Sequence, residues 1–408
     1  MAKALMVVSS SAAANGAEGS LFGGLVSVAT EANTQSQATE AATFSILRAR
    51  DQAGGLGTRT IQFRKGGANG NLVVSRSDSG TMEDITNTDV LSSADLYNLA
   101  FTDAIAGDPS YTYITVVVEF ASGHGCFHGS STFTGIIFDV ASATRFIAIN
   151  GNFAADGATT EANVATRNRA YTSWEAMQVR VTANARNNDS TFVNRIGLAD
   201  GTGLITVATT QTGLFTDTAI GDAVADGDLL DVSLTLGTGV QDLTLSLVAA
   251  TPKGSSKCDV VAASQAGVAR TASATAHYVQ LGGSFTSFNT TGTNQRTPVG
   301  FDGVASNVRC YISANTLTGT ATLKLIKNGV AVITVNITAG AANQWFENTA
   351  DSVTFVDGDT LCYEVDEGTS GSATFHMFAV TLDAAPVEEV RRQHPVISHQ
   401  AIARAASW

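Results

Sequence analysis

The sequence is poor in the residues that hold small or charged proteins together. Its 408 residues include four cysteines, five prolines and only 14% charged residues. Four cysteines in a chain of this length do not form a disulfide framework, so an apolar core must stabilise the fold. Cys310 and Cys362 both lie in the last third of the chain and allow one bridge. Buried free thiols, made in a reducing compartment, are the favoured alternative.

Positive charge and long apolar runs are also scarce. Lys and Arg total 23 against 36 Asp and Glu, for a net charge of −13, and no dense basic block is present. Phosphate binding needs a concentrated positive surface, so we expect no nucleic-acid partner. No apolar run approaches the roughly 20 residues of a membrane span. The apolar stretch Ala4 to Val8 is shorter than the roughly 7–15-residue core of a signal peptide, so we expect a cytoplasmic product.

Short alternating runs separated by glycine and aspartate are abundant. In "TATLKLIKNG", Ala321, Leu323 and Leu325 share one face of a predicted strand, and Asn328-Gly329 suits a tight hairpin turn. Helical periodicity is almost absent before residue 385. Short strands at this spacing predict an all-β protein built of sandwiches.

The strand pattern is written three times. The segments "TRTIQFRKGG", "TFVNRIGLADG" and "TATLKLIKNG" correspond, and each is followed by a large apolar residue, two polar or acidic residues and a further turn. That turn reads Asp-Gly-Asp at 226–228 and 357–359, whereas "VLSSADLYNL" replaces it in the first copy. Each copy is long enough to bury its own core, so we expect tandem domains. The matched turn glycines are predicted at Gly66, Gly201 and Gly329, and the matched apolar residues are Met82, Phe215 and Phe346.

The repeat gives a predicted domain organisation. It consists of an N-terminal arm at 1–19, repeats at 20–121, 144–250 and 276–384, linkers at 122–143 and 251–275, and a C-terminal docking arm at 385–408.

Motifs for chemistry are few. His124, Cys126 and His128 lie close together and are ligand types for a soft metal, but no second cluster completes the site, so a Gly-rich linker is expected. The Asp-Gly-Asp segments lack the further oxygen ligands of a calcium loop and are explained as turns. No nucleophile elbow, zinc-protease helix or phosphate loop is present. We therefore expect no enzyme, no catalytic residue, no cofactor and no metal.

The tail "APVEEVRRQHPVISHQAIARAASW" departs from the strand pattern. If Ser398 caps a short helix, Ile397, Ala401, Ala405 and Trp408 fall on one face. Such a stripe suits docking on a neighbouring subunit, and a frayed tail is the alternative. The predicted partner-docking residues are Arg391, Arg392, Ile397, Ile402 and Trp408.

The third copy, "TATLKLIKNGVAVITVNITAG" followed by "WFENTADSVTFVDGDTLCYEV", resembles the small jelly-roll domains of bacteriophage virion proteins. The resemblance implies three tandem jelly-roll domains with a tumour-necrosis-factor-like subunit fold and a homotrimer. It also implies a capsid decoration or cement protein on the outer shell of the virion, assembled in the host cytoplasm and bound to the major capsid protein or other virion subunits.

Two other functions stay open. One is a receptor-binding tail fibre or head spike that recognises a host-surface glycan, with Trp174 or Trp345 contacting the sugar. The other is a carbohydrate-binding module or adhesin. A fold of this kind hosts many functions, so the strand pattern alone does not choose among them.

Overall fold

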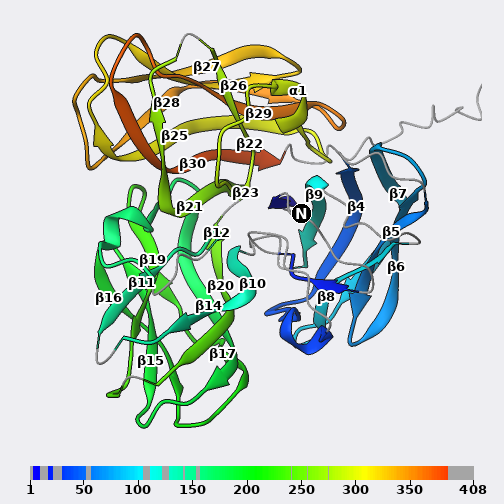
Figure 1. The fold of residues 1–408 in the computed structure, drawn as a ribbon. Coiled ribbons are helices and arrows are strands. Elements are labelled where there is room, and N and C mark those ends of the chain that lie inside the picture. Colours follow the sequence, from blue (N-terminus) through cyan, green and yellow to red (C-terminus); the bar gives the residue numbers. More distant parts are fainter. Residues whose placement is uncertain are drawn as a thin grey trace, which may run out of the picture.

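The computed structural model describes residues 3–9, 17–21, 30–51, 57–103, 111–121, 128–140, 143–152, 157–239, 241–254, 256–273 and 275–384. Strands dominate these residues, and their sheets pack in layers (Figure 1). Helical structure within them is limited to η1 (Glu31–Asn33), η2 (Glu161–Asn163) and α1 (Gly292–Gln295). The predicted all-β sandwich architecture is therefore confirmed. No described helix is long and apolar enough to span a bilayer.

The strands of residues 3–121, called the first unit, form two sheets in the order β1-β9-β4-β7 and β2-β8-β5-β6, with β3 pairing β8. Their bounds are β1 Lys3–Ser9, β2 Ala17–Gly19, β3 Ser36–Gln37, β4 Ala42–Asp51, β5 Arg59–Lys65, β6 Ala68–Arg76, β7 Gly80–Leu91, β8 Leu96–Asp103 and β9 Tyr111–Phe120.

The second unit, residues 128–254, repeats this arrangement with sheets β17-β14-β20-β10-β12 and β11-β19-β15-β16; β18 pairs β14 and β13 pairs β19. Its strands are β10 His128–Phe138, β11 Thr144–Ile147, β12 Gly151–Asn152, β13 Thr166–Arg167, β14 Tyr171–Asn184, β15 Ser190–Ile196, β16 Ala199–Val207, β17 Gly213–Asp217, β18 Asp222–Ala223, β19 Leu229–Thr235 and β20 Leu243–Gly254.

The third unit, residues 256–384, has sheets β21-β30-β25-β28 and β22-β29-β26-β27; β23 pairs β21 and β24 pairs β29. Its strands are β21 Lys257–Thr271, β22 His277–Gln280, β23 Gly283–Ser284, β24 Thr297–Pro298, β25 Gly303–Asn315, β26 Ala321–Lys327, β27 Val330–Ile337, β28 Gln344–Phe355, β29 Thr360–Asp366 and β30 Ser372–Ala384. Among the described strands, a parallel pairing of Asn152 with Ser264 continues the sheet from the second unit into the third.

Strand register shows that the three units are copies. Met82 lies opposite Ala49, Phe215 opposite Val179 and Phe346 opposite Cys310. Ala49, Val179 and Cys310 in turn face Ile114, Val248 and Phe378 on the other neighbouring strand. The predicted equivalence of the three apolar residues is therefore confirmed.

One matched turn was predicted wrongly. The β15–β16 hairpin turns at Gly197-Leu198, whereas Gly201 lies within β16. The other two hairpins turn at Gly66-Gly67 and Asn328-Gly329. Gly197 and Leu198 both take positive φ, 60° and 68°, so the Asp-Gly pair that followed was not needed for the reversal. The corrected turns are evenly spaced, because Gly67, Leu198 and Gly329 are each 131 residues apart.

The predicted arm at 1–19 and the predicted linkers at 122–143 and 251–275 contain strands β1, β10 and β21, each of which opens a unit. β1 is paired with β9 along its whole length, and β21 pairs with β30. Residues 258–265 of β21 are all buried, so both faces are covered and no polar alternation marks the strand. A strand buried on both faces is easily mistaken for a connection in a sequence pattern.

Aromatic side chains fill the space between the paired sheets. In the first unit, the Phe44 ring lies 4.9 Å from the Phe63 ring across the sandwich. In the third, Tyr363 stacks on Phe378 at 5.6 Å. The core also crosses between units, because Leu5, together with Val7 and Val117 of the first unit, belongs to the apolar cluster of the third. The three units therefore pack against one another as well as within themselves (Figure 1).

Candidate functional site: the junctions of the three units

Three polar side chains at one repeat position reach into a neighbouring unit. Arg48, Gln178 and Arg309 each precede the matched inward-facing residue by one position, so they project from the outer face of the sheet. Arg48 of the first unit donates to the third, at the Val299 carbonyl (2.9 Å) and the Asp357 carboxylate (3.0 Å).

Gln178 and Arg309 also make contacts between units. Gln178 of the second unit exchanges two hydrogen bonds with the Gln37 backbone of the first, at 3.0 and 2.6 Å. Arg309 of the third unit donates twice to the Arg167 carbonyl of the second, at 3.1 and 2.8 Å. The contacts run from first to third, third to second and second to first. The three units therefore close a ring within one chain, which Figure 1 shows as three lobes around a common centre.

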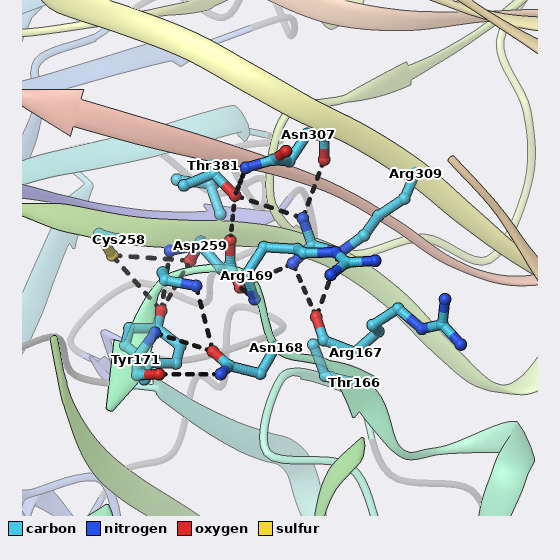
Figure 2. Close-up of polar contacts among 12 residues, drawn as sticks. Thr166, Arg167, Asn168, Arg169, Tyr171, Cys258, Asp259, Asn307, Arg309 and Thr381 are labelled. Atoms are coloured by element: carbon cyan, nitrogen blue, oxygen red, sulfur yellow. Dashed lines mark hydrogen bonds and ion pairs between the residues drawn. The ribbon is translucent and has the colours of Figure 1, made fainter. Parts of the chain in front are cut away.

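The junction of the second and third units holds a buried ion pair (Figure 2). Arg309 Nη2 lies 2.6 Å from Asp259 Oδ2, and the two side chains are 0% and 1% exposed. Thr381 Oγ1 donates to Asp259 Oδ1 at 2.6 Å, and the Arg169 N–H donates to Oδ2 at 3.2 Å. Arg309 also donates to the Asn307 carbonyl at 2.9 Å. Because these charges are paired and bonded on several sides, the cluster holds the two units together.

His128 extends this network toward the centre of the ring. The Asp259 N–H donates to Tyr171 Oη at 2.8 Å, and Tyr171 Oη also contacts His128 Nε2. His128 Nδ1 lies 2.6 Å from Asn150 Oδ1. Burial lowers the pKa of His128 and raises that of Tyr171 well above its usual value. His128 is thus a neutral, doubly bonded core residue, and its two predicted companions lie outside the described residues.

A groove of about 500 Å³ opens beside the buried pair, between the second and third units. One wall carries Arg169, which makes a forked contact with Glu347 (2.6 and 2.7 Å) and reaches Asp226 at 2.7 Å. Arg167 also contacts Glu347, at 3.0 Å. Burial alone would raise the pKa of Glu347, but the neighbouring arginines, Arg169 first and then Arg167 and Arg309, hold it below its usual value. A charged ligand in this groove would have to displace existing ion pairs.

Several predicted candidates are buried or packed against neighbouring side chains. Trp174 is fully buried and its Nε1 donates to the Ala176 carbonyl at 3.0 Å, so it cannot stack on a sugar. Trp345 is half-buried and packs on the Tyr311 ring at 5.7 Å. Cys310 and Cys362 are free and buried, and burial raises the pKa of Cys362 to about 12.

The remaining cysteines and the predicted docking residues lie partly or wholly outside the described residues. Cys258 is disulfide-bonded, which the sequence reading did not anticipate, and its partner lies outside the described residues. The predicted docking residues of the C-terminal arm, Arg391, Arg392, Ile397, Ile402 and Trp408, also lie outside them. Within the described ranges, no group of three or more His, Cys, Asp or Glu side chains is placed to hold a metal ion.

Sequence reasoning missed the three ring contacts. Arg48, Gln178 and Arg309 differ in chemistry and look like ordinary strand residues. Their shared place, one residue before Ala49, Val179 and Cys310, was available from the repeat alignment and is the only signal that links them.

Comparisons with known proteins add little. No protein-family model matches the chain, and no curated protein matches it. Among solved structures, a Paenibacillus xanthan lyase matches at a TM-score of 0.19 and 10% identity, over 85% of this chain and 51% of that one. This chain thus spans about half the length of the lyase chain. A similarity this low carries no argument about fold or activity.

Proposed function

We propose that the chain is a non-enzymatic structural protein of a bacteriophage virion, a decoration or cement protein on the outer capsid shell. We further propose that its three units are tandem jelly-roll domains. The strand order supports this, because the chain crosses between the sheets β1-β9-β4-β7 and β2-β8-β5-β6 at most steps, as it does in a jelly roll. Among the described strands of the first unit, only the step from β2 to β3 and the β5–β6 hairpin stay within one sheet. The closed ring of three units carries the functional part of the proposal.

The ring suits a binding role. The side faces of the units are buried in the junctions, so the chain forms one body that exposes three related outer surfaces. A body of this kind can contact three related sites on a repeating shell at once. Three weak contacts made together add avidity without any single strong site. The partners would be the major capsid protein or other virion subunits, and the protein would join the virion in the host cytoplasm.

The ring changes the expected oligomer. A homotrimer was expected because a closed ring hides apolar side faces, and here the chain covers such faces with its own units. We propose that one chain takes the place of a trimer. Light scattering of the free protein should then give about one chain mass of 42.0 kDa. A stable species of three chains would restore the homotrimer and overturn the single-chain ring.

Electron microscopy of the source particle tests the function. Density for one chain at three-fold positions of the outer shell is the expected result. Density at a tail tip or spike would favour the glycan-binding fibre instead, and absence from purified particles would overturn a virion role.

The C-terminal arm has its own test. Removing residues 385–408, which carry Arg391, Arg392, Ile397, Ile402 and Trp408, should leave thermal melting unchanged but reduce loading onto particles. Normal copy number after truncation would show that the arm does not dock.

A further inference from the structure

The third unit has lost an ion pair that the first two share. Arg64 forms a bidentate ion pair with Glu31 through Nε and Nη2, both at 3.1 Å. Arg195 grips Glu161 in the same way, at 2.8 and 3.1 Å. Each glutamate opens the short η helix of its unit. The pair therefore closes the corner between that helix and the β5–β6 or β15–β16 hairpin.

In the third unit both members are replaced. Ile326 takes the place of the arginine, because it faces Ala331 and Cys362 as Arg195 faces Asp200 and Asp231. The first residue of the short helix is Gly292. Instead of an ion pair, this corner holds a pocket of about 340 Å³. That volume lies at the lower end of the range for small-molecule sites.

An aromatic ring lines the pocket, and the arginine that covers the matching ring in the second unit is replaced. In the second unit the Arg195 guanidinium lies 5.8 Å above the Phe146 ring. Tyr278 is the matching residue, since it pairs with Asn289 as Phe146 pairs with Ala158. With isoleucine in place of the arginine, the Tyr278 ring lines the open pocket. An aromatic face in a pocket is a surface on which the C–H face of a sugar ring can rest.

One cation in the pocket lacks a partner. Arg296 lines it, and within the described part of the chain Arg296 makes no hydrogen bond or ion pair. The guanidinium lies against Gly329, where an added Cβ would be 2.4 Å from Nη2, so the glycine keeps room for it. A guanidinium in this position suits a carboxylate, which it can hold with two parallel hydrogen bonds.

The remaining groups select hydroxyls. Glu364 lines the pocket and is paired with Lys324 at 2.8 Å, and its carboxylate also interacts with the Tyr278 hydroxyl. Thr290, Thr291 and Thr293 add exposed hydroxyls at the rim. A phosphate, with its larger negative charge, would be repelled by Glu364 more strongly than a carboxylate would. One cation, one aromatic face and several hydroxyl partners fit a ring that carries one carboxylate.

We propose that this pocket binds an acidic monosaccharide of the hexuronate type, with the carboxylate on Arg296 and a ring face on Tyr278. The site is independent of the capsid role, since either can hold without the other. The experiment is calorimetry on the full chain with glucuronate and galacturonate, with glucose and galactose as neutral counterparts, and with acetate and inorganic phosphate as bare anions. An acid that binds at least 10-fold more tightly than its neutral parent and than acetate is the expected result.

Two variants locate the binding. Arg296→Gln removes the cation without breaking a hydrogen bond or ion pair among the described residues, and it should erase the preference for the acid. The double change Gly292→Glu with Ile326→Arg rebuilds the ion pair of the other units, fills the pocket and should abolish binding. Melting curves check that each variant folds, because a side chain at 292 requires the Tyr278 ring to move.

Three outcomes would overturn the site. They are equal binding of acid and neutral sugar, tighter binding of phosphate than of either uronate, and unchanged uronate binding by Arg296→Gln.

Discussion

Two junctions of the ring perform the same task with different chemistry. At one repeat position the second unit uses the neutral side chain of Gln178, bonded to a neighbouring backbone, and the third uses Arg309, paired with a buried aspartate. Both reach the same short strand of the next unit, β3 or β13. The geometry of the ring is thus kept while the electrostatics diverge. Replacing Gln178 leaves no unpaired charge, whereas replacing Arg309 leaves the buried Asp259 carboxylate without its partner. The two junctions should therefore differ in how much stability each loses on mutation.

The largest expected loss of folding stability follows from replacing Arg309. Replacing it with alanine strands the buried Asp259 carboxylate, and we expect a loss of about 3–5 kcal/mol in the free energy of unfolding. The matched change Gln178→Ala should cost about 1–2 kcal/mol, because it leaves only neutral backbone groups unpaired. Denaturant unfolding of the two variants measures the difference. Equal losses would show that the ion pair is no more important than the amide.

A second pair of changes sharpens this result. Asp259 occupies the place that Leu5 holds in the first unit, three residues before the position paired with Phe378 or Ile114. The double variant Arg309→Gln with Asp259→Leu therefore removes both charges. It should recover much of the loss, because an apolar or amide replacement leaves no buried charge. If the double variant is no more stable than Arg309→Ala, burial of the unpaired carboxylate is not the cause.

The next effect compares Asn98 with Asp231, which occupy the same register in the first and second units. Asn98 Nδ2 donates to Thr34 Oγ1 at 3.1 Å. Asp231 is fully buried, and burial followed by the nearby Glu161 carboxylate raises its pKa well above the usual value. The folded chain therefore holds a proton that the unfolded chain releases, so stability falls as pH rises above about 3.8.

Asp231→Asn should remove this pH dependence. Asparagine donates to Glu161 without taking up a proton, so we expect a gain of about 1–2 kcal/mol at neutral pH. Below the usual aspartate range the gain should vanish. Melting temperatures from pH 3 to pH 8 measure it, and parallel curves for the two proteins would contradict it.

The all-β class, the three-fold repetition and the matched apolar residues could be predicted from the sequence, because each depends on neighbouring residues and on turns. The order of strands in the sheets could not, because it pairs segments far apart in the chain, such as β1 with β9. The opening strands β1, β10 and β21 were missed as strands, and in β21 the reason is that burial on both faces removes the alternation that marks a strand. The pocket of the third unit was also missed. Its signal was the loss of Glu and Arg at Gly292 and Ile326, which is meaningful only once the paired arginines of the other units are known to touch their glutamates.

A smaller effect concerns the segment that follows each matched apolar residue. Asp84 accepts hydrogen bonds from the Val73 N–H (3.0 Å) and from the Thr86 and Asn87 N–H groups, and Asn348 holds the same place in the third unit. Burial would raise the pKa of Asp84, but these donors lower it to about 2. Its contribution to stability is therefore complete above about pH 3.8 and is lost as pH falls through about 2.

Asp84→Asn tests that contribution. The amide cannot accept from Val73 with its nitrogen, so we expect a loss of about 1–2 kcal/mol at pH 7. The gap to the unchanged protein should narrow as pH approaches 2, where Asp84 itself becomes protonated. Unfolding curves at pH 7 and pH 2.5 provide the measurement. If the difference in the free energy of unfolding is the same at both pH values, the charge of Asp84 does not stabilise these hydrogen bonds.

The smallest effect comes from the turn that reads Asp-Gly-Asp in two units and Ser-Ala-Asp in the first. In each, an aspartate accepts the N–H three residues earlier: Asp95 from Ser92 (2.7 Å), Asp228 from Ala225 (2.7 Å) and Asp359 from Val356 (2.9 Å). These bonds account for the aspartates as turn residues. The residue before each aspartate has positive φ, 91° at Gly227, 87° at Gly358 and 76° at Ala94.

Ala94 thus holds the left-handed conformation with a side chain that disfavours it, at a cost of roughly 1–2 kcal/mol. Ala94→Gly relieves that strain but loosens the unfolded chain, which offsets about 0.4–1 kcal/mol of the gain. We expect a net gain of about 0.5–1 kcal/mol, and a loss from the reverse change Gly358→Ala, whose site is open enough for a Cβ but has the same φ. Opposite shifts in melting temperature for the two variants would show that backbone conformation, and not packing, governs this turn in the first and third units. Destabilisation by Ala94→Gly would show that the alanine methyl group stabilises the fold by more than the backbone strain costs.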